Sequence, residues 1–326
     1  MLKNVGVVIV TYGNRAELLK KVVEKVLLFE EVVRIVIVDN NSCGDLNINH
    51  KDIIIIRNSF NTGSAYGYKQ GISTLMKQEN VEYIWLLDDD NLPNFNSFKD
   101  MNIFVNSKIN FQLNKDAILC LRDDRKAYKK AIKMPNKVKY MFPTKNSFLG
   151  FNIFYIVQKL YWNIFINYIG KKLVDAEYVE VPVAPYGGLI FHKSLVENIG
   201  YPNEEMYLYS DDNEYTYRIT SNNGRIILCS KFVIKDIDES WFIRTKKGYL
   251  SSLLTSDQES RVYYTVRNRV YTEKKYLLHN KYIYSLNKMI YLLILKILAL
   301  KYKKQTRYKY ILKAISDGDK GILGQL

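Results

Sequence analysis

Three adjacent aspartates, Asp88, Asp89 and Asp90, stand at the end of a strongly apolar run in the sequence. Like charges held this close repel one another, and crowding raises the pKa of a carboxyl group that has no partner. A hard divalent cation relieves the repulsion, because carboxylate oxygens suit Mg²⁺ or Mn²⁺ and the ion can also bridge substrate phosphates. Asp88 and Asp90 can reach one ion if the chain turns between them. The alternative is a solvated loop in which Asp90 caps a helix.

A second acidic pair, Asp211 and Asp212, precedes a helical pattern over residues 213–221. Acidic side chains near a helix N-terminus interact favourably with the helix dipole, so capping alone would account for the pair. The functional alternative is a general base that removes a proton from a substrate held beside a metal ion. Few side chains compete for this role, because the three histidines stand alone and lack the spacing of metal ligands: His50, His192 and His279.

The cysteines indicate a reduced protein rather than a disulfide framework or a zinc site. Cys43, Cys120 and Cys229 are odd in number and lack a CxxC spacing, which is typical of free thiols in the cytosol. The apolar run at residues 5–10 is short, and no small-residue cleavage pattern follows it. We therefore predict a first strand there and not a signal sequence.

Strand-like runs alternate with helical patterns in the first 90 residues. The strands are predicted at residues 5–10, 32–38, 52–57 and 81–87. Helices are predicted at residues 14–29, with Asn14 as the N-cap, and at about residues 68–77. This alternation predicts an α/β fold with a mostly parallel, doubly wound sheet.

Polar residues and glycines follow the ends of these predicted strands. Ligands bind doubly wound sheets outside the carboxyl ends of the strands. Thr11, Tyr12 and Asp39 fall there, as do Asp88 and the loop that contains Gly63. The glycines of that loop do not form the GxGxxG fingerprint, but they place flexible backbone where a nucleotide could approach the main chain.

The rest of the chain gives a coarser pattern. Residues 148–169 are apolar and aromatic but carry several polar interruptions, which favours a helical hairpin or an amphipathic flap over a membrane span. Strand character returns at residues 181–191, around Gly187 and Gly188, and again at residues 225–228. Residues 277–315 are predicted to form basic helices rich in tyrosine, leucine and isoleucine.

Positive charge is concentrated at the C-terminal end. The chain carries a net charge of +15, of which residues 241–326 contribute 18 Lys+Arg against 5 Asp+Glu, a net +13. Within that region, residues 289–302 are largely apolar, broken by Lys296 and flanked by lysines. The segment is short for a bilayer span but fits an interfacial helix, to which each nearby lysine would add about 1 kcal/mol on an anionic leaflet. The alternative is a helix packed on the catalytic domain.

Six segments together resemble family 2 glycosyltransferases of the GT-A fold, especially bacterial rhamnosyl- and galactofuranosyltransferases. They occur in the family's order over nearly the whole chain, at residues 7–19, 35–42, 61–72, 85–93, 184–219 and 263–271. The resemblance implies a nucleotide-sugar-binding and catalytic domain over residues 1–240. A basic, largely helical region that contacts the membrane interface would follow over residues 241–326.

The resemblance also implies roles for the residues at the strand ends. Thr11, Tyr12 and Asp39 match positions that hold the base and ribose of the nucleotide, and Gly63 lies in the adjoining loop. The triplet at residues 88–90 matches the DxD-type motif that engages the donor diphosphate and its Mn²⁺ or Mg²⁺ ion.

The resemblance implies catalytic and acceptor roles further along the chain. Asp212, or Asp211 in its place, matches the base that deprotonates the acceptor hydroxyl. Gly187 and Gly188 match the segment that lines the acceptor side.

The sequence departs from this family at the third metal ligand, which is commonly a histidine in the segment aligned with residues 232–241. Lys235 stands at the corresponding place, and a protonated lysine cannot ligate a cation. Either Asp236 or Asp238 takes the role, or the metal relies on water and the diphosphate. A further alternative is that Lys235 contacts the diphosphate directly.

The expected function is an inverting, metal-dependent transfer from a UDP- or dTDP-sugar, such as galactofuranose or rhamnose, to a glycan or lipid-linked acceptor in bacterial surface polysaccharide synthesis. The enzyme would be cytoplasmic and peripheral on the inner face of the cell membrane, and oligomerisation is compatible with the sequence. A QxxRW pattern is absent, so we expect one or a few sugars per binding event.

Three alternatives remain. One is a non-catalytic protein of the same fold that docks on glycans or membranes, and another is a nucleic-acid-binding protein, suggested by a pI near 9.4. Aspartates at strand ends argue against nucleic acid. A glycosidase with two carboxylates is the third, and the nucleotide-type strand-end motifs do not suit it.

Overall fold

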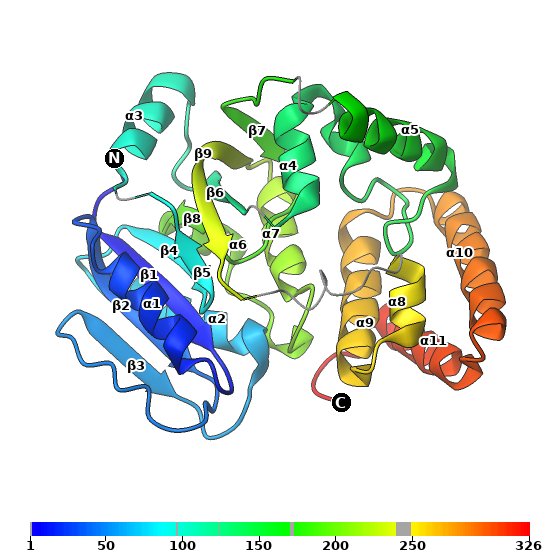
Figure 1. Cartoon of the computed structure of the whole chain (residues 1–326), viewed down its shortest axis with the longest axis horizontal. Coiled ribbons are helices and arrows are strands. Elements are labelled where there is room, and N and C mark those ends of the chain that lie inside the picture. Colours follow the sequence, from blue (N-terminus) through cyan, green and yellow to red (C-terminus); the bar gives the residue numbers. More distant parts are fainter. Residues whose placement is uncertain (1, 96, 123, 170–172, 239–248) are drawn as a thin grey trace. The chain divides into compact units, whose positions relative to one another are not determined.

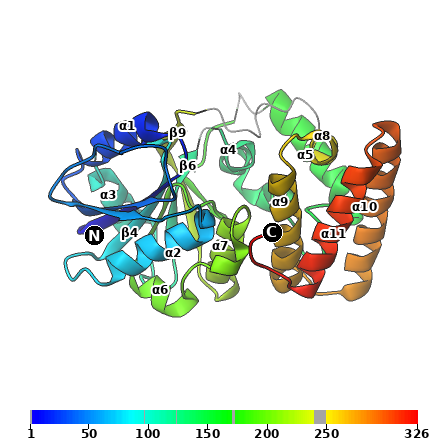
Figure 2. The ribbon, with the colours of Figure 1, turned by 90° about the horizontal axis from the view of Figure 1, so that it is seen from below.

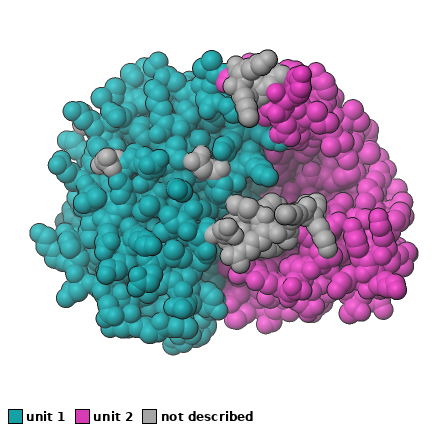
Figure 3. All heavy atoms as spheres, viewed as in Figure 1, with its two compact units in different colours: residues 1–135, 174–204, 212–238 teal, residues 136–173, 205–211, 239–326 magenta. Residues whose placement is uncertain are grey.

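The computed structural model of the chain describes residues 2–95, 97–122, 124–169, 173–238 and 249–326. The chain divides into two compact units, coloured separately in Figure 3. Unit 1 comprises Met1–Pro135, Val174–Glu204 and Asp212–Asp238, and unit 2 comprises Asn136–Leu173, Glu205–Asp211 and Glu239–Leu326. The boundary expected at residue 240 lies outside the described residues. Unit 2 also takes in residues 136–173, which the sequence assigned to the first domain.

The first half of unit 1 is the parallel sheet that the sequence predicts. Its strands are β1 (Val5–Thr11), β2 (Val32–Asp39), β3 (Ile53–Arg57) and β4 (Tyr83–Asp88). They pair in parallel in the spatial order β3-β2-β1-β4, so their carboxyl ends meet at one edge (Figure 1). The apolar runs are buried on both faces of β1, β4 and the carboxyl-terminal half of β2, as expected of a parallel sheet covered by helices, whereas β3 at the edge is only partly buried. The predicted α/β fold is confirmed.

The sheet continues with strands of mixed direction. These are β5 (Asn91–Pro93), β6 (Ala117–Arg122), β7 (Tyr178–Val181), β8 (Leu189–His192) and β9 (Ile226–Asp236). The order beyond β4 is β8-β6-β9-β5, and β7 also pairs with β9. Of the run predicted at residues 181–191, only Val181 at the end of β7 and residues 189–191 of β8 are in strands, and residues 182–188 between them contain the Gly-Gly turn. The strand predicted at residues 225–228 extends to Asp236.

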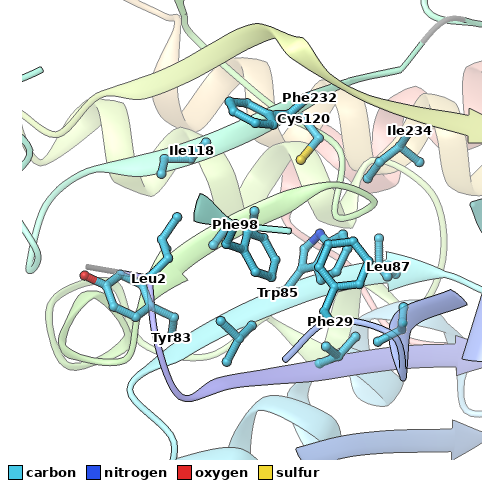
Figure 4. Packing of buried hydrophobic residues seen from close by; sticks show 14 of the residues in the cluster. Leu2, Phe29, Tyr83, Trp85, Leu87, Phe98, Ile118, Cys120, Phe232 and Ile234 are labelled. Carbon is cyan, nitrogen blue, oxygen red and sulfur yellow. The ribbon is translucent and has the colours of Figure 1, made fainter. Parts of the chain in front are cut away.

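Helices cover both faces of the unit 1 sheet (Figure 2). Helices α1 (Ala16–Val26) and α3 (Lys99–Lys108) lie on one face, and α2 (Gly63–Met76) and α6 (Ser194–Ile199) lie on the other. The first face is centred on Phe29, Trp85 and Phe98, whose ring centroids lie 5.2–5.5 Å apart (Figure 4). On the second face, a Cβ added to Gly71 would lie 2.2 Å from Val8, so α2 requires glycine there to approach β1.

Helix α1 begins later than predicted. Its N-cap is Arg15, which makes no capping hydrogen bond through its side chain, so the prediction that Asn14 caps the helix is wrong. Gly13 has a positive φ of 74° just before this point. The segment that precedes α1 carries Arg15 to Asp89 and Asp90, which follow β4, and this electrostatic contact takes the place of the expected cap.

Unit 1 also contains the helices that follow β6 and precede β9. They are α4 (Lys126–Lys133), a 3₁₀ turn at Pro135–Tyr140 that leads into unit 2, and α7 (Asp211–Ser221), whose first residue is assigned to unit 2. Thr216 of α7 bonds to both the N–H and the carbonyl of Ala184, at 3.0 and 2.9 Å. These bonds fix α7 against the segment that precedes β8.

Unit 2 is helical, as predicted for the C-terminal region. Its helices are α5 (Ile153–Ile169), α8 (Tyr249–Thr255), α9 (Glu259–Tyr276), α10 (Lys281–Lys301) and α11 (Gln305–Lys320). Their core contains Phe148, Val266, Tyr291, Leu295 and Ile311. Of the two alternatives for residues 148–169, the helical hairpin is wrong, because α5 is a single helix preceded by a short turn that Phe148 and Phe151 close. The amphipathic flap stays a prediction.

Candidate active site

The aspartate triplet lies in a turn between two strands of unit 1. Asp88 ends β4, and the chain reverses through Asp89 and Asp90 into β5. Because a strand follows the triplet, the alternative in which Asp90 caps a helix is wrong. Strand β5 pairs with β9 in a register that sets Asn91 opposite Asp236. Two segments far apart in the sequence thus contribute the aspartate cluster, which we define as Asp88, Asp89, Asp90, Asp236 and Asp238.

One buried arginine joins the two halves of this cluster. The guanidinium of Arg122, at the end of β6, donates to Asp88 Oδ2 at 2.9 Å and also to Asp236 Oδ2. Its Nε donates to Asp124 Oδ1 at 3.4 Å. Only 3% of the Arg122 side chain is exposed, so water solvates its positive charge poorly. The carboxylates balance that charge instead.

A second arginine crosses the cluster from the start of α1. Arg15 donates to Asp89 Oδ1 at 2.7 Å, to Asp90 Oδ2 at 2.6 Å and to Asp238 Oδ2 at 2.7 Å. The hydroxyl of Thr11 also donates to Asp89, at 2.7 Å. A guanidinium suits this task because its planar set of donors can serve several carboxylates at once.

Asn91 and Gly187 complete the cluster. The amide of Asn91 donates to Asp90 at 2.9 Å and to Asp236 at 2.8 Å, while its oxygen accepts the backbone N–H of Asp88. A Cβ added to Gly187 would lie 2.0 Å from the Asn91 oxygen and 2.8 Å from Asp88 Oδ2. Glycine is therefore required for the segment before β8 to approach the aspartates.

Negative charge exceeds positive charge in this cluster. Burial raises the pKa of Asp89 to about 6 and that of Asp236 to about 7, although Arg15 and Arg122 oppose the shift. The pKa of Asp90 is also raised, first by burial and then by Asp88. With five carboxyl groups against two guanidiniums in a buried place, an additional cation would favour the ionised form of the carboxyls whose pKa is raised.

The chemistry of these side chains fits a hard divalent cation, since all of the available acidic donors are oxygens. In the part of the chain that the structure describes, however, no group of three acidic, histidine or cysteine side chains is arranged as a formed metal centre. Instead, the carboxylates form ion pairs with Arg15 and Arg122. Asp88 is the most open of them, with 41% of its side chain exposed, so binding a cation requires the other aspartates to turn from their arginine partners.

The structure separates the candidates for the third ligand. Asp236 bonds to Arg122 and Asn91 within the cluster, and Asp238 bonds to Arg15. Lys235 is exposed, and its position between Ile234 and Asp236 on β9 directs its side chain away from the face that Asp236 uses.

The residues expected to hold the nucleotide lie at the carboxyl ends of β1 and β2. Thr11 and Asp39 are direct partners in the sheet register, and both are buried, whereas Tyr12 is 54% exposed. Asp39 accepts the backbone N–H of Ser42 at 2.7 Å, which forms a tight turn after β2.

An asparagine that the sequence analysis did not single out holds the glycine loop beside them. The buried Asn40 donates to the carbonyl of Gly63 at 2.9 Å and accepts hydrogen bonds from Asn58 and Thr62. Gly63 has a positive φ of 82° and opens α2. The loop is thus fixed with the N-terminus of α2 at the same edge of the sheet as Thr11 and Asp39.

The two candidates for the general base occupy different environments. Burial raises the pKa of Asp212 to about 6, while a hydrogen bond from the backbone N–H of Asn213 and the charge of Arg125 oppose the shift. The charges of Asp88 and Arg122 also act on Asp212, so its carboxyl lies near the aspartate cluster. Asp211 is buried and belongs to unit 2.

A strained loop in unit 2 leads into this acidic pair. Tyr207, Tyr209 and Ser210 have φ values of 61°, 63° and 59°, a left-handed conformation that costs about 1–2 kcal/mol per residue with a side chain. The amide of the buried Asn268 on α9 lies 2.7–2.9 Å from the carbonyls of Met206, Leu208 and Tyr209.

The neighbouring Arg267 orients that asparagine by donating to its oxygen at 2.8 Å, and it also donates to the Met206 carbonyl at 3.1 Å. These contacts hold the loop in a conformation it would not otherwise adopt. The sequence contained the Arg-Asn pair within residues 263–271 but gave no signal of this role.

Comparisons with known proteins agree with this arrangement. The sequence model of glycosyl transferase family 2 matches residues 7–200. The crystal structure of GalNAc-T7 with UDP, GalNAc and Mn²⁺ is similar, with a TM-score of 0.52 and 11% identity, over 83% of this chain and 48% of that one. The chain therefore spans about half the length of GalNAc-T7.

The crystal structure of S. aureus TarS residues 1–349 gives a TM-score of 0.46 at 13% identity, over 97% of this chain and 91% of that one. A comparison with curated protein sequences finds no significant match. The family match covers more than half of the chain and includes the strands that carry the aspartate triplet and the nucleotide-side residues. The chain has the GT-A fold and belongs to glycosyl transferase family 2.

Proposed function

We propose that this glycosyltransferase is inverting and metal-dependent, and that it transfers a sugar from a UDP- or dTDP-sugar to a glycan or lipid-linked acceptor. The observation that carries the proposal is the proximity of two acidic groups with different environments. The aspartate cluster sets five carboxyl groups against two guanidiniums, and Asp212 beside it has a pKa of about 6. The first suits a cation with a diphosphate, and the second suits a base that works near neutral pH.

The donor would lie along the carboxyl ends of the parallel strands. Thr11, Asp39 and the Gly63 loop would contact the nucleoside, as expected for a ligand at this edge of the sheet. Asp88 and Asp90, with Asp236 as the third, would hold Mn²⁺ or Mg²⁺. The GalNAc-T7 structure contains UDP and Mn²⁺, which supports a nucleoside diphosphate and a divalent cation as the ligand class.

The chemical step then needs no nucleophile from the protein. Asp212 takes the proton of the acceptor hydroxyl as its oxygen attacks the anomeric carbon in line with the bond to the diphosphate. That bond breaks, the nucleoside diphosphate leaves with the electron pair, and the new glycosidic bond has inverted configuration. Asp88, Asp90 and Asp236 would hold the divalent cation, which would supply positive charge to stabilise the leaving group. Arg15 and Arg122, released from some of their carboxylates, would supply further positive charge beside it.

The acceptor would belong to a bacterial surface polysaccharide or its lipid-linked precursor. A cytoplasmic location fits the free thiols of Cys43, Cys120 and Cys229.

A thermal-shift screen with Mn²⁺ tests the donor class. We expect UDP or dTDP to raise the melting temperature, since a ligand at 100 times its Kd stabilises a protein by about 2.7 kcal/mol. ADP and GDP should have little effect, and removing the metal with EDTA should abolish the shift. A protein that no nucleoside diphosphate stabilises, with or without metal, would contradict the proposal and favour a non-catalytic docking role.

A further inference from the structure

Helix α10 is apolar on two opposite sides. One side packs into the core of unit 2 through Tyr284, Tyr291 and Leu295. The other side exposes large apolar residues that recur every three or four positions: Tyr282, Leu286, Met289, Leu293, Ile297 and Leu300. We call these six residues the α10 stripe. Leu293 and Ile297 are 58% and 56% exposed, where a surface helix of a soluble protein normally carries polar residues.

Helix α5 of the same unit repeats this feature. Five of its exposed apolar residues are also spaced by three or four positions: Phe154, Val157, Tyr161, Ile164 and Tyr168. Leu160 is exposed beside them. The helix begins beside α10, because the backbone N–H of Ile153 donates to Asn287 of α10 at 2.9 Å. Single apolar residues scattered over a surface are normal, but two helices with continuous exposed apolar faces indicate an interaction surface.

The charge of the protein is divided sharply between its two units. Unit 2 contains 24 Lys+Arg against 8 Asp+Glu, a net +16, whereas unit 1 contains 24 against 25, a net −1. Exposed lysines lie along and at both ends of the stripe, at Lys281, Lys296, Lys301 and Lys304. The partner of unit 2 should therefore be apolar beneath a layer of negative charge.

An anionic bilayer has both properties. The other candidate partners fit less well, since nucleic acid offers no place for an aliphatic stripe, and a second copy would bring two +16 units together. By length and composition α10 is, within the described residues, the one helix that could cross a membrane. Crossing would require removing Tyr291 and Leu295 from the core and breaking the Lys288–Asp319 ion pair, so we favour a helix that lies in the interface.

We propose that unit 2 docks on the surface of an anionic lipid bilayer, with the α10 stripe in the boundary between headgroups and acyl chains and its lysines on the headgroups. This proposal does not depend on the reaction that unit 1 performs. It requires both hydrophobic contact and charge attraction, so binding should weaken at high salt and on neutral lipid.

Sedimentation of the full chain with vesicles tests the hydrophobic part. We expect the double variant Leu293→Gln/Ile297→Gln to bind phosphatidylglycerol-containing vesicles about ten-fold more weakly than the wild type, from the lost apolar contact. The matched control is Leu28→Gln/Ile103→Gln, which changes the same residue types at exposed positions of unit 1 and should bind normally. Both variants should keep the wild-type melting temperature, because all four side chains are exposed.

A second pair of variants tests the contribution of charge. Lys296→Gln/Lys301→Gln removes two lysines beside the stripe, and Lys20→Gln/Lys21→Gln, at exposed positions of α1, is the control. The first pair should weaken binding to anionic vesicles and the second should not, while vesicles of phosphatidylcholine alone should bind little protein. Equal binding by the stripe variant and the wild type would overturn the proposal. The proposal would also be overturned if the wild type bound no vesicles and formed a dimer in sedimentation velocity that the stripe variant did not form.

Discussion

Replacing Asp212 with asparagine is expected to abolish sugar transfer while leaving donor binding intact. Asparagine has nearly the same shape but cannot accept the proton of the acceptor hydroxyl, and loss of a general base costs about 10²- to 10⁴-fold in rate. The proposed donor contacts lie at the aspartate cluster and the strand ends, so affinity for the nucleotide should change little. Steady-state transfer rates, together with calorimetric titration of the nucleotide, measure both quantities.

Asp211→Asn is the matched control, since it makes the same change one residue earlier. If that variant alone lost transfer, the base would have to be reassigned to Asp211. The pH profile gives a second readout. The pKa of Asp212 is raised to about 6, and its basic form is the ionised one, so the rate should be full above this value and fall as the pH is lowered through it. Asp89 and Asp236 titrate in the same range, but they should affect donor affinity and not the maximal rate.

Replacing Asn268 with leucine is expected to lower transfer by about 100-fold, although this residue lies in unit 2 and outside the carboxylate site. Its amide serves the carbonyls of Met206, Leu208 and Tyr209. Without it, the left-handed residues before Asp211 lose the contacts that offset their strain, and the position of Asp212 is no longer defined. Donor affinity should remain, since the loop does not belong to the aspartate cluster.

Destabilisation alone would not produce this pattern, and Asn287→Leu supplies the control. Asn287 is also fully buried in unit 2, where it bonds to the carbonyl of Asn146 and the N–H of Ile153. Both variants should lower the free energy of unfolding by about 1–3 kcal/mol, because each leaves buried backbone groups without partners. Only Asn268→Leu should reduce transfer under conditions where both proteins are folded. Equal rates in the two variants would assign Asn268 a purely structural role.

The sequence predicted the parts of this protein that depend on local pattern. The apolar runs of β1, β2 and β4 predicted the parallel sheet, and the parallel geometry then placed Thr11, Asp39 and Asp88 at one edge. A single sequence does not reveal contacts between distant side chains. Arg15 and Arg122 meet aspartates that lie far away along the chain, and nothing in their own neighbourhoods marks them.

The failures have physical causes as well. Asn14 has the right chemistry for a helix cap, but the attraction between Arg15 and three aspartates decides where α1 begins. The polar residues within residues 148–169 suggested a break, yet α5 tolerates them in one continuous helix. The sequence left open whether residues 289–302 form an interfacial helix or pack on the catalytic domain, because composition shows that a helix is apolar but not which side another element covers.

The most direct test of the central claim is a calorimetric titration of UDP and dTDP into wild-type protein and into Asp90→Ala, with Mn²⁺ and with EDTA. Asp90 contacts both Arg15 and Asn91 in the aspartate cluster, and Asp100→Ala on the exposed first turn of α3 serves as the control. We predict metal-dependent binding of one nucleotide to the wild type and to the control, and no binding to Asp90→Ala. Undiminished metal-dependent affinity in Asp90→Ala would contradict the assignment of the donor diphosphate and its cation to this cluster.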